Sequence, residues 1–134
     1  MVVDTSVLIA VLRNEAEAEA FAAAIAKADR VLVGAPTLFE TRLVLINQGS
    51  DEIEKALDDL VAGASIQTVG FEEETYRLST EAFRRFGKGR HPARLNFGDC
   101  MAYAVSRATG EPLLFKGNDF SQTDVKAHPA SVSA

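Results

Sequence analysis

The sequence has few of the residues that form disulfides or zinc sites. Cys100 is the only cysteine, and the 134 residues include two histidines. A lone cysteine cannot form an intramolecular disulfide, so the chain gives no sign of an oxidising compartment. Cys100 lies in an apolar helical stretch, and we interpret it as a core residue. Zinc, which prefers His and Cys ligands, is disfavoured for the same lack of ligands.

Long apolar runs and an excess of positive charge are also missing. No stretch approaches the length needed to cross a bilayer, and the first residues lack the basic and apolar segments of a secretion signal. We therefore expect a cytoplasmic protein that is not inserted in a membrane. Lys and Arg number 14 against 19 Asp and Glu, a net charge of −5. This balance argues against nucleic-acid binding by bulk attraction alone, although local basic patches remain open.

The composition is that of an ordinary globular protein. Hydrophobic residues make up 47% of the chain and charged residues 25%, which excludes disordered and fibrous classes. The length suits one hydrophobic core, and neither an internal repeat nor a linker divides the chain. We expect a single domain over residues 1–134.

Helical and strand patterns alternate along the chain. Apolar, β-branched runs predict strands, and spacings of three and four residues predict helices. The predicted strands are 2–3, 31–33, 66–69 and 112–115, with a possible short edge strand at 123–125; the predicted helices are 6–12, 15–28, 36–48, 51–61, 71–86 and 96–109. Parallel strands need crossover helices, so this alternation predicts an α/β fold, a three-layer α/β/α sandwich with a mainly parallel central sheet.

Four acids stand at positions where a carboxylate calls for an explanation. Asp4 and Asp119 follow predicted strands, Glu40 lies inside an apolar helical segment, and Asp99 begins a helix. The carboxyl ends of parallel strands meet at one edge of a sheet, so these side chains are expected to share a crevice. Clustered carboxylates repel one another unless a cation lies among them, and oxygen ligands suit Mg²⁺ or Mn²⁺. Asp4, Glu40, Asp99 and Asp119 are therefore the candidate metal ligands and catalytic acids.

Helix capping is the alternative explanation for three of these acids. Asp4 can cap the helix that follows it, and Thr37 to Glu40 fits a capping box. Asn96 to Asp99 fits a weaker capping box, with Asp in place of Glu. The sequence alone leaves the capping roles and the metal site both open.

A loop with a local positive charge precedes Asp99. The segment 87–95 contains two glycines and a proline, which break the helical pattern. Lys88, Arg90 and Arg94, with His91 among them and Lys116 farther along the chain, are candidate contacts to RNA phosphates. The alternative is a loop that is merely solvated.

Several segments together resemble a PIN domain of the VapC toxin family. They are Val-Val-Asp-Thr-Ser at 2–6, Glu40 within a helix, Leu-Asn-Phe-Gly-Asp-Cys at 95–100 and Leu-Leu-Phe-Lys-Gly-Asn-Asp-Phe at 113–120. The resemblance spans nearly the whole chain. It implies a Mg²⁺-dependent endoribonuclease, the toxin of a bacterial type II toxin–antitoxin pair, in which the four acids match the metal-binding acids. It also implies a homodimer and an antitoxin whose peptide covers the active-site groove.

The resemblance extends to supporting residues and has one departure. Ser6 matches the small hydroxyl residue that supports the first acid and orients a ligand or water. Many PIN domains carry a further acid two residues before the position of Asp119, where this chain has Gly117. Asn118 is a candidate helper for the last ligand. Four acids are compatible with one metal ion or with two.

Two other functions remain open at this stage. The first is another Mg²⁺-dependent phosphoryl-transfer protein, such as a phosphatase or a receiver-like domain, but the residues after Asp4 lack the second acid of an Asp-x-Asp motif. The second is a non-catalytic module that binds RNA or an antitoxin, against which the retained acids argue.

If cleavage occurs, a carboxylate-held cation can activate water and stabilise the developing charge without a protein nucleophile. An exposed single-stranded RNA loop would reach such a pocket most easily.

Overall fold

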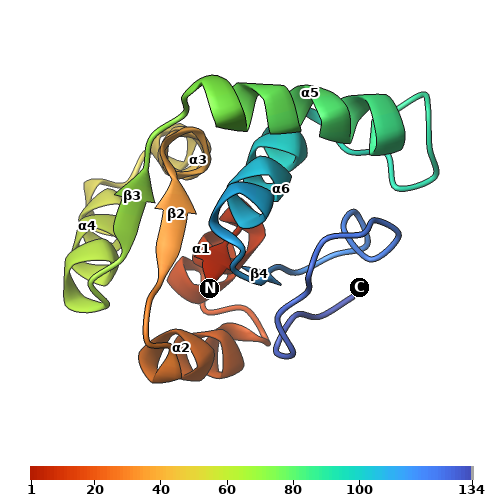
Figure 1. Ribbon diagram of the computed structural model, residues 1–134. Helices are drawn as coiled ribbons and strands as arrows, with labels where there is room; N and C mark the ends of the chain where they lie inside the picture. Colours follow the sequence, from red (N-terminus) through yellow and green to blue (C-terminus); the bar gives the residue numbers. More distant parts are fainter. Residues whose placement is uncertain (134) are drawn as a thin grey trace.

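The computed structural model describes residues 1–133, and Ala134, the last residue of the expected single domain, lies outside the described residues. Strands and helices alternate in the predicted manner (Figure 1). In chain order they are β1 (Val2–Val3), α1 (Thr5–Leu12), α2 (Ala18–Lys27), β2 (Leu32–Gly34), α3 (Ala35–Gln48), α4 (Asp51–Gly63), β3 (Gln67–Val69), α5 (Glu73–Phe86), α6 (Phe97–Thr109) and β4 (Leu113–Leu114).

The four strands form one parallel sheet in the order β3-β2-β1-β4. Successive residues of a strand point to opposite faces of a sheet. The first residues of β1, β2 and β4 pack with α5 and α6, and the residues after them pack with α1 and α2. The predicted three-layer α/β/α sandwich with a parallel central sheet is therefore confirmed.

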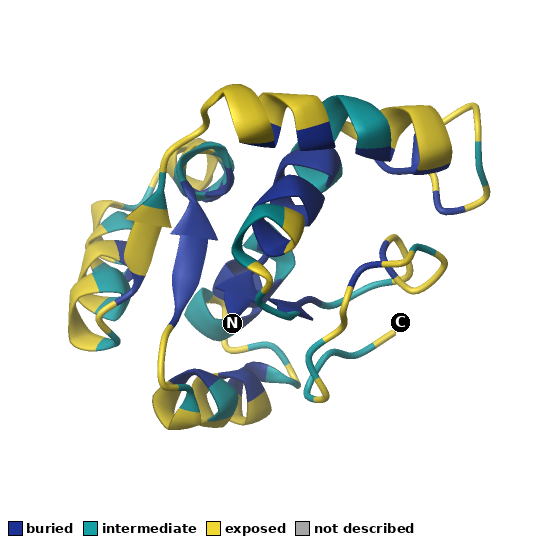
Figure 2. Cartoon of the chain, in the orientation of Figure 1, coloured by how far each residue is buried: buried dark blue, intermediate teal, exposed yellow. Residues whose placement is uncertain are grey.

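The centre of the sheet and helix α6 are the most buried parts of the molecule (Figure 2). Residues 100–106 of α6 are all buried, whereas the edge strand β3 exposes Gln67 and Thr68. Cys100 is 4% exposed, which confirms that it is a core residue. Burial, assisted by the nearby charge of Asp99, raises the pKa of its thiol to about 11. The thiol is therefore protonated at neutral pH, unlike a nucleophilic cysteine.

The helices are short and cover the sheet. The longest, α3 and α5, have 14 residues each. Among residues 1–133, no helix has both the length and the apolar character needed to cross a membrane.

Two predicted helices begin two or three residues later than the sequence pattern indicates. The segment before α2 is a turn in which Asn14 has a φ of 52°, so the helix predicted from Glu15 starts at Ala18. Helix α5 starts at Glu73 rather than at residue 71, because Glu72 and Thr75 form a capping box. Periodic apolar spacing does not reveal either local boundary.

The edge strand predicted at 123–125 is wrong. Asp124 turns this segment toward the helices: it accepts a hydrogen bond from the Tyr103 hydroxyl at 2.6 Å and lies 3.0 Å from Arg85 and 3.1 Å from Arg107. Extended pairing occurs farther along as isolated bridges, Leu113 with Ala127 and Lys116 with Val132.

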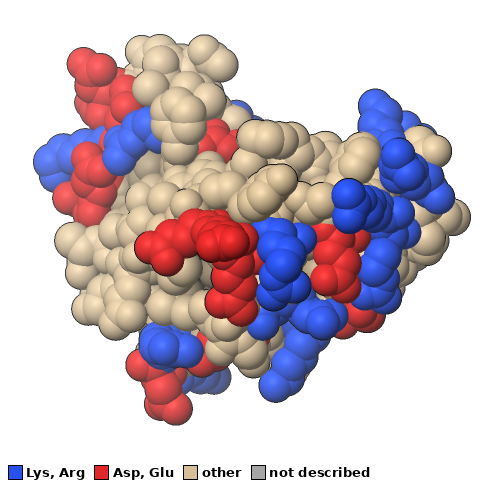
Figure 3. Space-filling view, turned by 45° about the horizontal axis from the view of Figure 1, so that its top comes forward, with Lys and Arg blue, Asp and Glu red and all other residues tan. Residues whose placement is uncertain are grey.

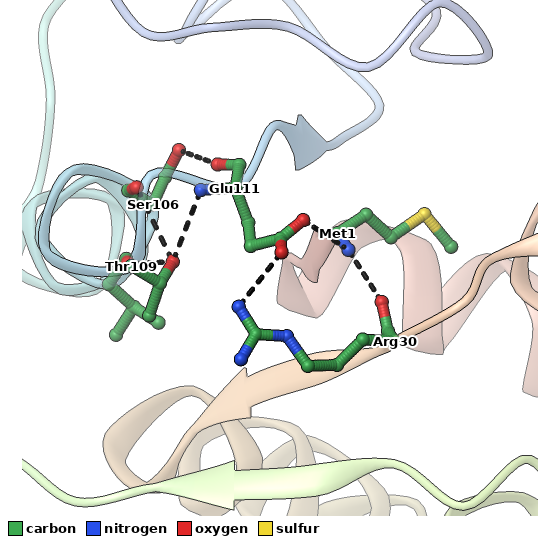
Figure 4. A network of polar contacts seen from close by, with 6 residues as sticks. Met1, Arg30, Ser106, Thr109 and Glu111 are labelled. Carbon is green, nitrogen blue, oxygen red and sulfur yellow. Dashed lines mark hydrogen bonds and ion pairs between the residues drawn. The ribbon is translucent and has the colours of Figure 1, made fainter.

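A polar network ties three strands at the amino edge of the sheet (Figure 4). The amino group of Met1 donates to the carbonyl of Arg30 at 2.6 Å and lies 3.0 Å from Glu111 Oε2. The Arg30 guanidinium is 2.8 Å from Glu111 Oε1. These contacts join the starts of β1, β2 and β4, and the opposite, carboxyl edge is where the candidate acids lie.

Candidate functional site

Asp4 lies where β1 passes into α1. It is the N-cap of α1 and is 7% exposed. Ser6 donates to Asp4 Oδ2 twice, from its backbone N–H at 3.1 Å and from its hydroxyl at 2.6 Å. The capping role read from the sequence is thus real, and the same two bonds fix the orientation of the carboxylate.

The charge of Asp4 is disfavoured in its surroundings. Burial raises the pKa of this carboxyl above its ordinary value, and the nearby charge of Glu40 raises it further. The hydrogen bonds from Ser6 act in the opposite direction without cancelling the effect of burial. A cation placed near Asp4 would favour its ionised form.

Glu40 is held by a hydroxyl of another helix. Helix α3 begins at Ala35, with Gly34 as its N-cap and no side-chain cap, so the capping box predicted from Thr37 to Glu40 is wrong. Glu40 Oε1 instead accepts a hydrogen bond from the Thr5 hydroxyl at 2.6 Å. This bond joins the second turn of α3 to the first turn of α1.

Gly98 lies against the other side of the Glu40 carboxylate. A Cβ atom at Gly98 would overlap Glu40 Oε2 and the carboxylate carbon. Sequence reasoning missed both Gly98 and Thr5 as residues that place Glu40. The available signals were a hydroxyl residue between Asp4 and Ser6, and a glycine inside the first turn of a helix, where glycine is unfavourable.

Asp99 closes a capping box at the start of α6. Its N–H donates to Asn96 Oδ1 at 2.9 Å, and the N–H of Asn96 donates to Asp99 Oδ2 at 3.0 Å. The predicted box is therefore confirmed. Burial is the main cause that raises the pKa of Asp99 to about 7, and the charges of Asp4, Asp119 and Glu40 raise it further against the lowering effect of the Asn96 bond. The four predicted acids thus share one electrostatic environment.

Asp119 is the most open of the four acids. It is exposed, in the turn that follows β4. Gly117, at the position where the family resemblance leads one to expect another acid, has a φ of 122°, which favours glycine. Asn118 is exposed, and its backbone carbonyl accepts a hydrogen bond from the Ser121 hydroxyl at 2.9 Å.

The four acids do not form a closed cage. Within residues 1–133, no group of three His, Cys, Asp or Glu side chains is close enough to enclose a metal ion. The donor set nevertheless fits Mg²⁺ or Mn²⁺ by its chemistry, because all four ligand candidates are carboxylates. Burial is the main cause that raises the pKa values of Asp4 and Asp99, and a bound cation would favour their ionised forms.

The basic loop, residues 87–95, surrounds a hollow of about 490 Å³. Lys88, Arg90 and Arg94 are exposed around it, and Lys and Arg side chains gather on this side of the molecule in Figure 3. His91 is tied into the loop, because its Nδ1 accepts from the N–H of Ala93 at 3.0 Å. The loop therefore offers cations to solvent while His91 has a structural contact.

Lys116 differs from these loop cations. Its ammonium lies 2.8 Å from Glu15 Oε1 and 2.8 Å from Glu17 Oε2. The structure thus places its charge between two glutamates rather than beside the basic loop.

An apolar hollow of about 550 Å³ lies between α5 and α6. Its lining includes Phe71, Tyr76, Phe83 and Phe97, of which Tyr76 is 62% exposed and Phe97 80%. Helix α3 adds three exposed apolar side chains, Phe39, Leu43 and Ile46. In the sequence, Phe39 directly precedes Glu40 and Phe97 lies two residues before Asp99.

This chain is similar to known proteins in its sequence and in its fold. Residues 1–126 match the model of the PIN domain family. Ribonuclease VapC28 of Mycobacterium tuberculosis is 45% identical over 127 residues, which are 94% of this chain and 96% of the relative, and ribonuclease VapC42 of the same species is 35% identical over 94% and 97%.

Two solved structures have the same fold at lower identity. The crystal structure of M. tuberculosis VapC20, described as a sarcin–ricin loop cleaving toxin, superposes with a TM-score of 0.73 at 21% identity, covering 96% of this chain and 98% of that one. A toxin–antitoxin complex from Klebsiella pneumoniae gives a TM-score of 0.71 at 15% identity, covering 99% and 95%. These structures share the fold, and the family match together with the sequence relatives shows that the chain belongs to the PIN domain family and, within it, to the VapC ribonucleases.

Proposed function

We propose that this protein is a Mg²⁺-dependent endoribonuclease, the toxin of a bacterial type II toxin–antitoxin module, and that it hydrolyses RNA phosphodiester bonds in the cytoplasm. The observation that carries the proposal is the gathering of Asp4, Glu40, Asp99 and Asp119 at one edge of the sheet, where burial, and after it the charges of the other three acids, raise the pKa of Asp99 to about 7. The ribonuclease names of the sequence relatives support it.

Asp4, Glu40, Asp99 and Asp119 would hold Mg²⁺, with Mn²⁺ as a plausible substitute. When bound, the cation supplies Lewis-acid activation of water and stabilises charge in the transition state. The other residues of the chain contribute by positioning these carboxylates. Ser6 orients Asp4, and Thr5 and Gly98 place Glu40. Asn118, beside Asp119, is available to assist the last ligand.

The basic loop is the proposed contact for RNA. Lys88, Arg90 and Arg94 would bind phosphates, with His91 at the same hollow. A local patch of this kind reconciles RNA binding with a net charge of −5. An unpaired RNA loop fits best, because a single strand can bring its scissile bond to a narrow acidic site.

An antitoxin and a second copy of the chain are the proposed protein partners. The Klebsiella toxin–antitoxin complex, which has the same fold at 15% identity, supports the first partner. The exposed apolar side chains of α3 and α5 support the second, because a second copy of the chain could cover them and remove them from water.

The proposal is tested by incubating antitoxin-free protein with total cellular RNA in Mg²⁺ or in EDTA and mapping the cut ends. We expect defined cuts in Mg²⁺, none in EDTA, and none with Asp4→Asn in Mg²⁺. Cleavage that persists in EDTA, or that Asp4→Asn retains at the parent's rate, would contradict the metal-dependent mechanism.

A non-catalytic module that binds RNA or an antitoxin is the second candidate. The observation in its favour is that, within residues 1–133, the acids do not approach one another as a ready-made metal cage. The same incubation separates the two functions, because a binding module would retain RNA on a filter without producing cut ends.

A further inference from the structure

Lys116 forms a three-membered ion cluster near the acidic edge. Its ammonium is 2.8 Å from a carboxylate oxygen of Glu15 and 2.8 Å from one of Glu17. All three side chains are partly buried, with exposed fractions of 29%, 31% and 24%. Glu17 Oε2 is buried, and the Lys116 ammonium at 2.8 Å compensates its charge.

The backbone of Lys116 leads directly to the first acid. Its N–H donates to the Ser6 hydroxyl at 3.0 Å, and that hydroxyl donates to Asp4 Oδ2 at 2.6 Å. A shift of residue 116 would therefore change the hydrogen bond that orients Asp4. Asp119 lies only three residues farther along the same segment.

The segment that carries Lys116 is anchored from two sides. On one side, the N–H of Gly117 donates to the Val132 carbonyl at 2.8 Å, and the N–H of Val132 donates to the Phe115 carbonyl at 3.0 Å. On the other side, the anchor is the Lys116 ammonium against the turn between α1 and α2, where Glu15 and Glu17 lie. The ion cluster thus completes a clamp on the residues between β4 and Asp119.

We propose that Lys116 is a positioning residue of the ribonuclease site, whose ion pairs with Glu15 and Glu17 hold the segment after β4 so that Ser6 and Asp4 keep their orientation. This role rests on the proposed ribonuclease function. It differs from phosphate binding, for which Lys116 would have to leave two carboxylates that it already contacts.

The surroundings of Lys116 favour a role in placement over a role in stability. A surface ion pair contributes little to folding, because solvent screens its charges and the side chains lose freedom. Removing the Lys116 ammonium, however, breaks both ion pairs, so the segment after β4 loses its anchor on the turn between α1 and α2. Lys55 and Asp59 on α4 form a pair of the same 2.8 Å length, but their side chains are 75% and 65% exposed and lie away from the acids.

The test compares Lys116→Met, Lys116→Arg and Lys55→Met. Each substitution keeps the backbone N–H, and both methionine variants remove one positive charge. Steady-state cleavage, which gives kcat and KM, and amide hydrogen exchange at residue 116 are measured together. We expect Lys116→Met to lower kcat about tenfold to a hundredfold, with a KM near the parent's and faster exchange of the amide. Lys116→Arg should restore both quantities, and Lys55→Met should change neither.

Two results would overturn the clamp. One is a Lys116→Met variant with the parent's kcat and the parent's amide protection. The other is an unchanged kcat with a raised KM and a flatter salt dependence, which would make Lys116 a phosphate contact. If Lys116→Met does not fold, the double variant Glu15→Gln, Glu17→Gln removes the ion pairs without creating repulsion, and the same two results apply to it. Failure of the ribonuclease function is distinct, because then the parent itself cuts no RNA while the exchange comparison still reports on the clamp.

Discussion

At the scale of single residues, two adjacent hydroxyls hold the carboxylates of different elements. Thr5 donates to Glu40 of α3, and Ser6 donates to Asp4 at the start of α1. Both belong to the first turn of α1, so a single helix start sets the relative orientation of two of the four acids. On the opposite side, the Glu40 carboxylate lies against Gly98, which has no Cβ atom to displace it.

Gly98 provides a test of this placement that leaves every acid in the chain. In Gly98→Ala the added Cβ would overlap the Glu40 carboxylate, which sits at the end of a flexible side chain and is displaced. We expect cleavage to fall about a hundredfold while the melting temperature changes little. Gly63→Ala on α4 is the matched control, because its Cβ meets nothing within 4 Å. Equal cleavage rates for the two variants would show that the position of Glu40 is unimportant.

Asp99 makes the stability of the metal-free protein depend on pH. Its pKa is about 7 in the folded chain against an ordinary 3.8, so the folded state releases this proton only at higher pH than the unfolded state. The contribution of Asp99 to stability is therefore full below its ordinary pKa and is lost as pH rises through about 7. Asp4, whose pKa is also raised, acts in the same direction.

Urea unfolding in EDTA between about pH 5 and pH 8 measures this effect. We expect the free energy of unfolding to decrease with pH more steeply in the parent than in Asp99→Asn. Glu17, Glu111 and Asp124 have lowered pKa values, so their contributions to the free energy of unfolding are lost only at pH values more acidic than this range. His128, whose pKa is lowered by burial, acts in the opposite direction and is common to both proteins. Parallel pH profiles for the two proteins would mean that Asp99 ionises normally.

At the scale of elements, the site forms where the carboxyl ends of parallel strands meet helix starts. Asp4 is the N-cap of α1, and Asp99 belongs to the capping box of α6. Capping and a functional site were alternatives in the sequence, but the structure combines them. The N–H groups that cap the helices also keep these carboxylates turned toward the same edge.

The basic loop yields a prediction about RNA affinity. If Arg90 and Arg94 bind phosphates, replacing both with Ala should weaken RNA binding and flatten its salt dependence, since fewer counterions are then released. The measurement uses Asp4→Asn as a background so that RNA remains intact. Replacing Lys27 and Lys55 with Ala removes the same charge elsewhere and should leave the salt slope unchanged. If both double variants bind RNA alike, the loop is merely solvated.

The apolar side chains of α3 and α5 yield a prediction about oligomeric state. Leu43→Glu or Tyr76→Glu should convert a dimer into a monomer at micromolar concentration, because a buried unpaired carboxylate is costly at an interface. Sedimentation velocity measures the change, and Ala23→Glu on the exposed face of α2 is the control. A parent protein that is already monomeric would refute the dimer.

At the scale of the whole molecule, periodicity and strand–helix alternation were sufficient to predict the layers and the parallel sheet. They could not predict the turn at 123–125, because the Asp124 contacts to Tyr103, Arg85 and Arg107 join segments that are distant in sequence. The same limit applies to the site. The acids were identifiable from their places in the pattern, whereas the role of Gly98 and the ion pairs of Lys116 depend on tertiary contacts.

The free energy of unfolding in Mg²⁺ and in EDTA tests the central claim most directly, that four carboxylates at one sheet edge form a divalent-cation site. For the parent we predict that Mg²⁺ or Mn²⁺ stabilises the fold by about 2.7 kcal/mol at a hundredfold excess over its dissociation constant. Asp4→Asn and Asp99→Asn should fold but lose most of this gain, because each keeps its volume while the ligand charge is removed. A parent protein whose unfolding is indifferent to both ions at millimolar concentration would contradict the site.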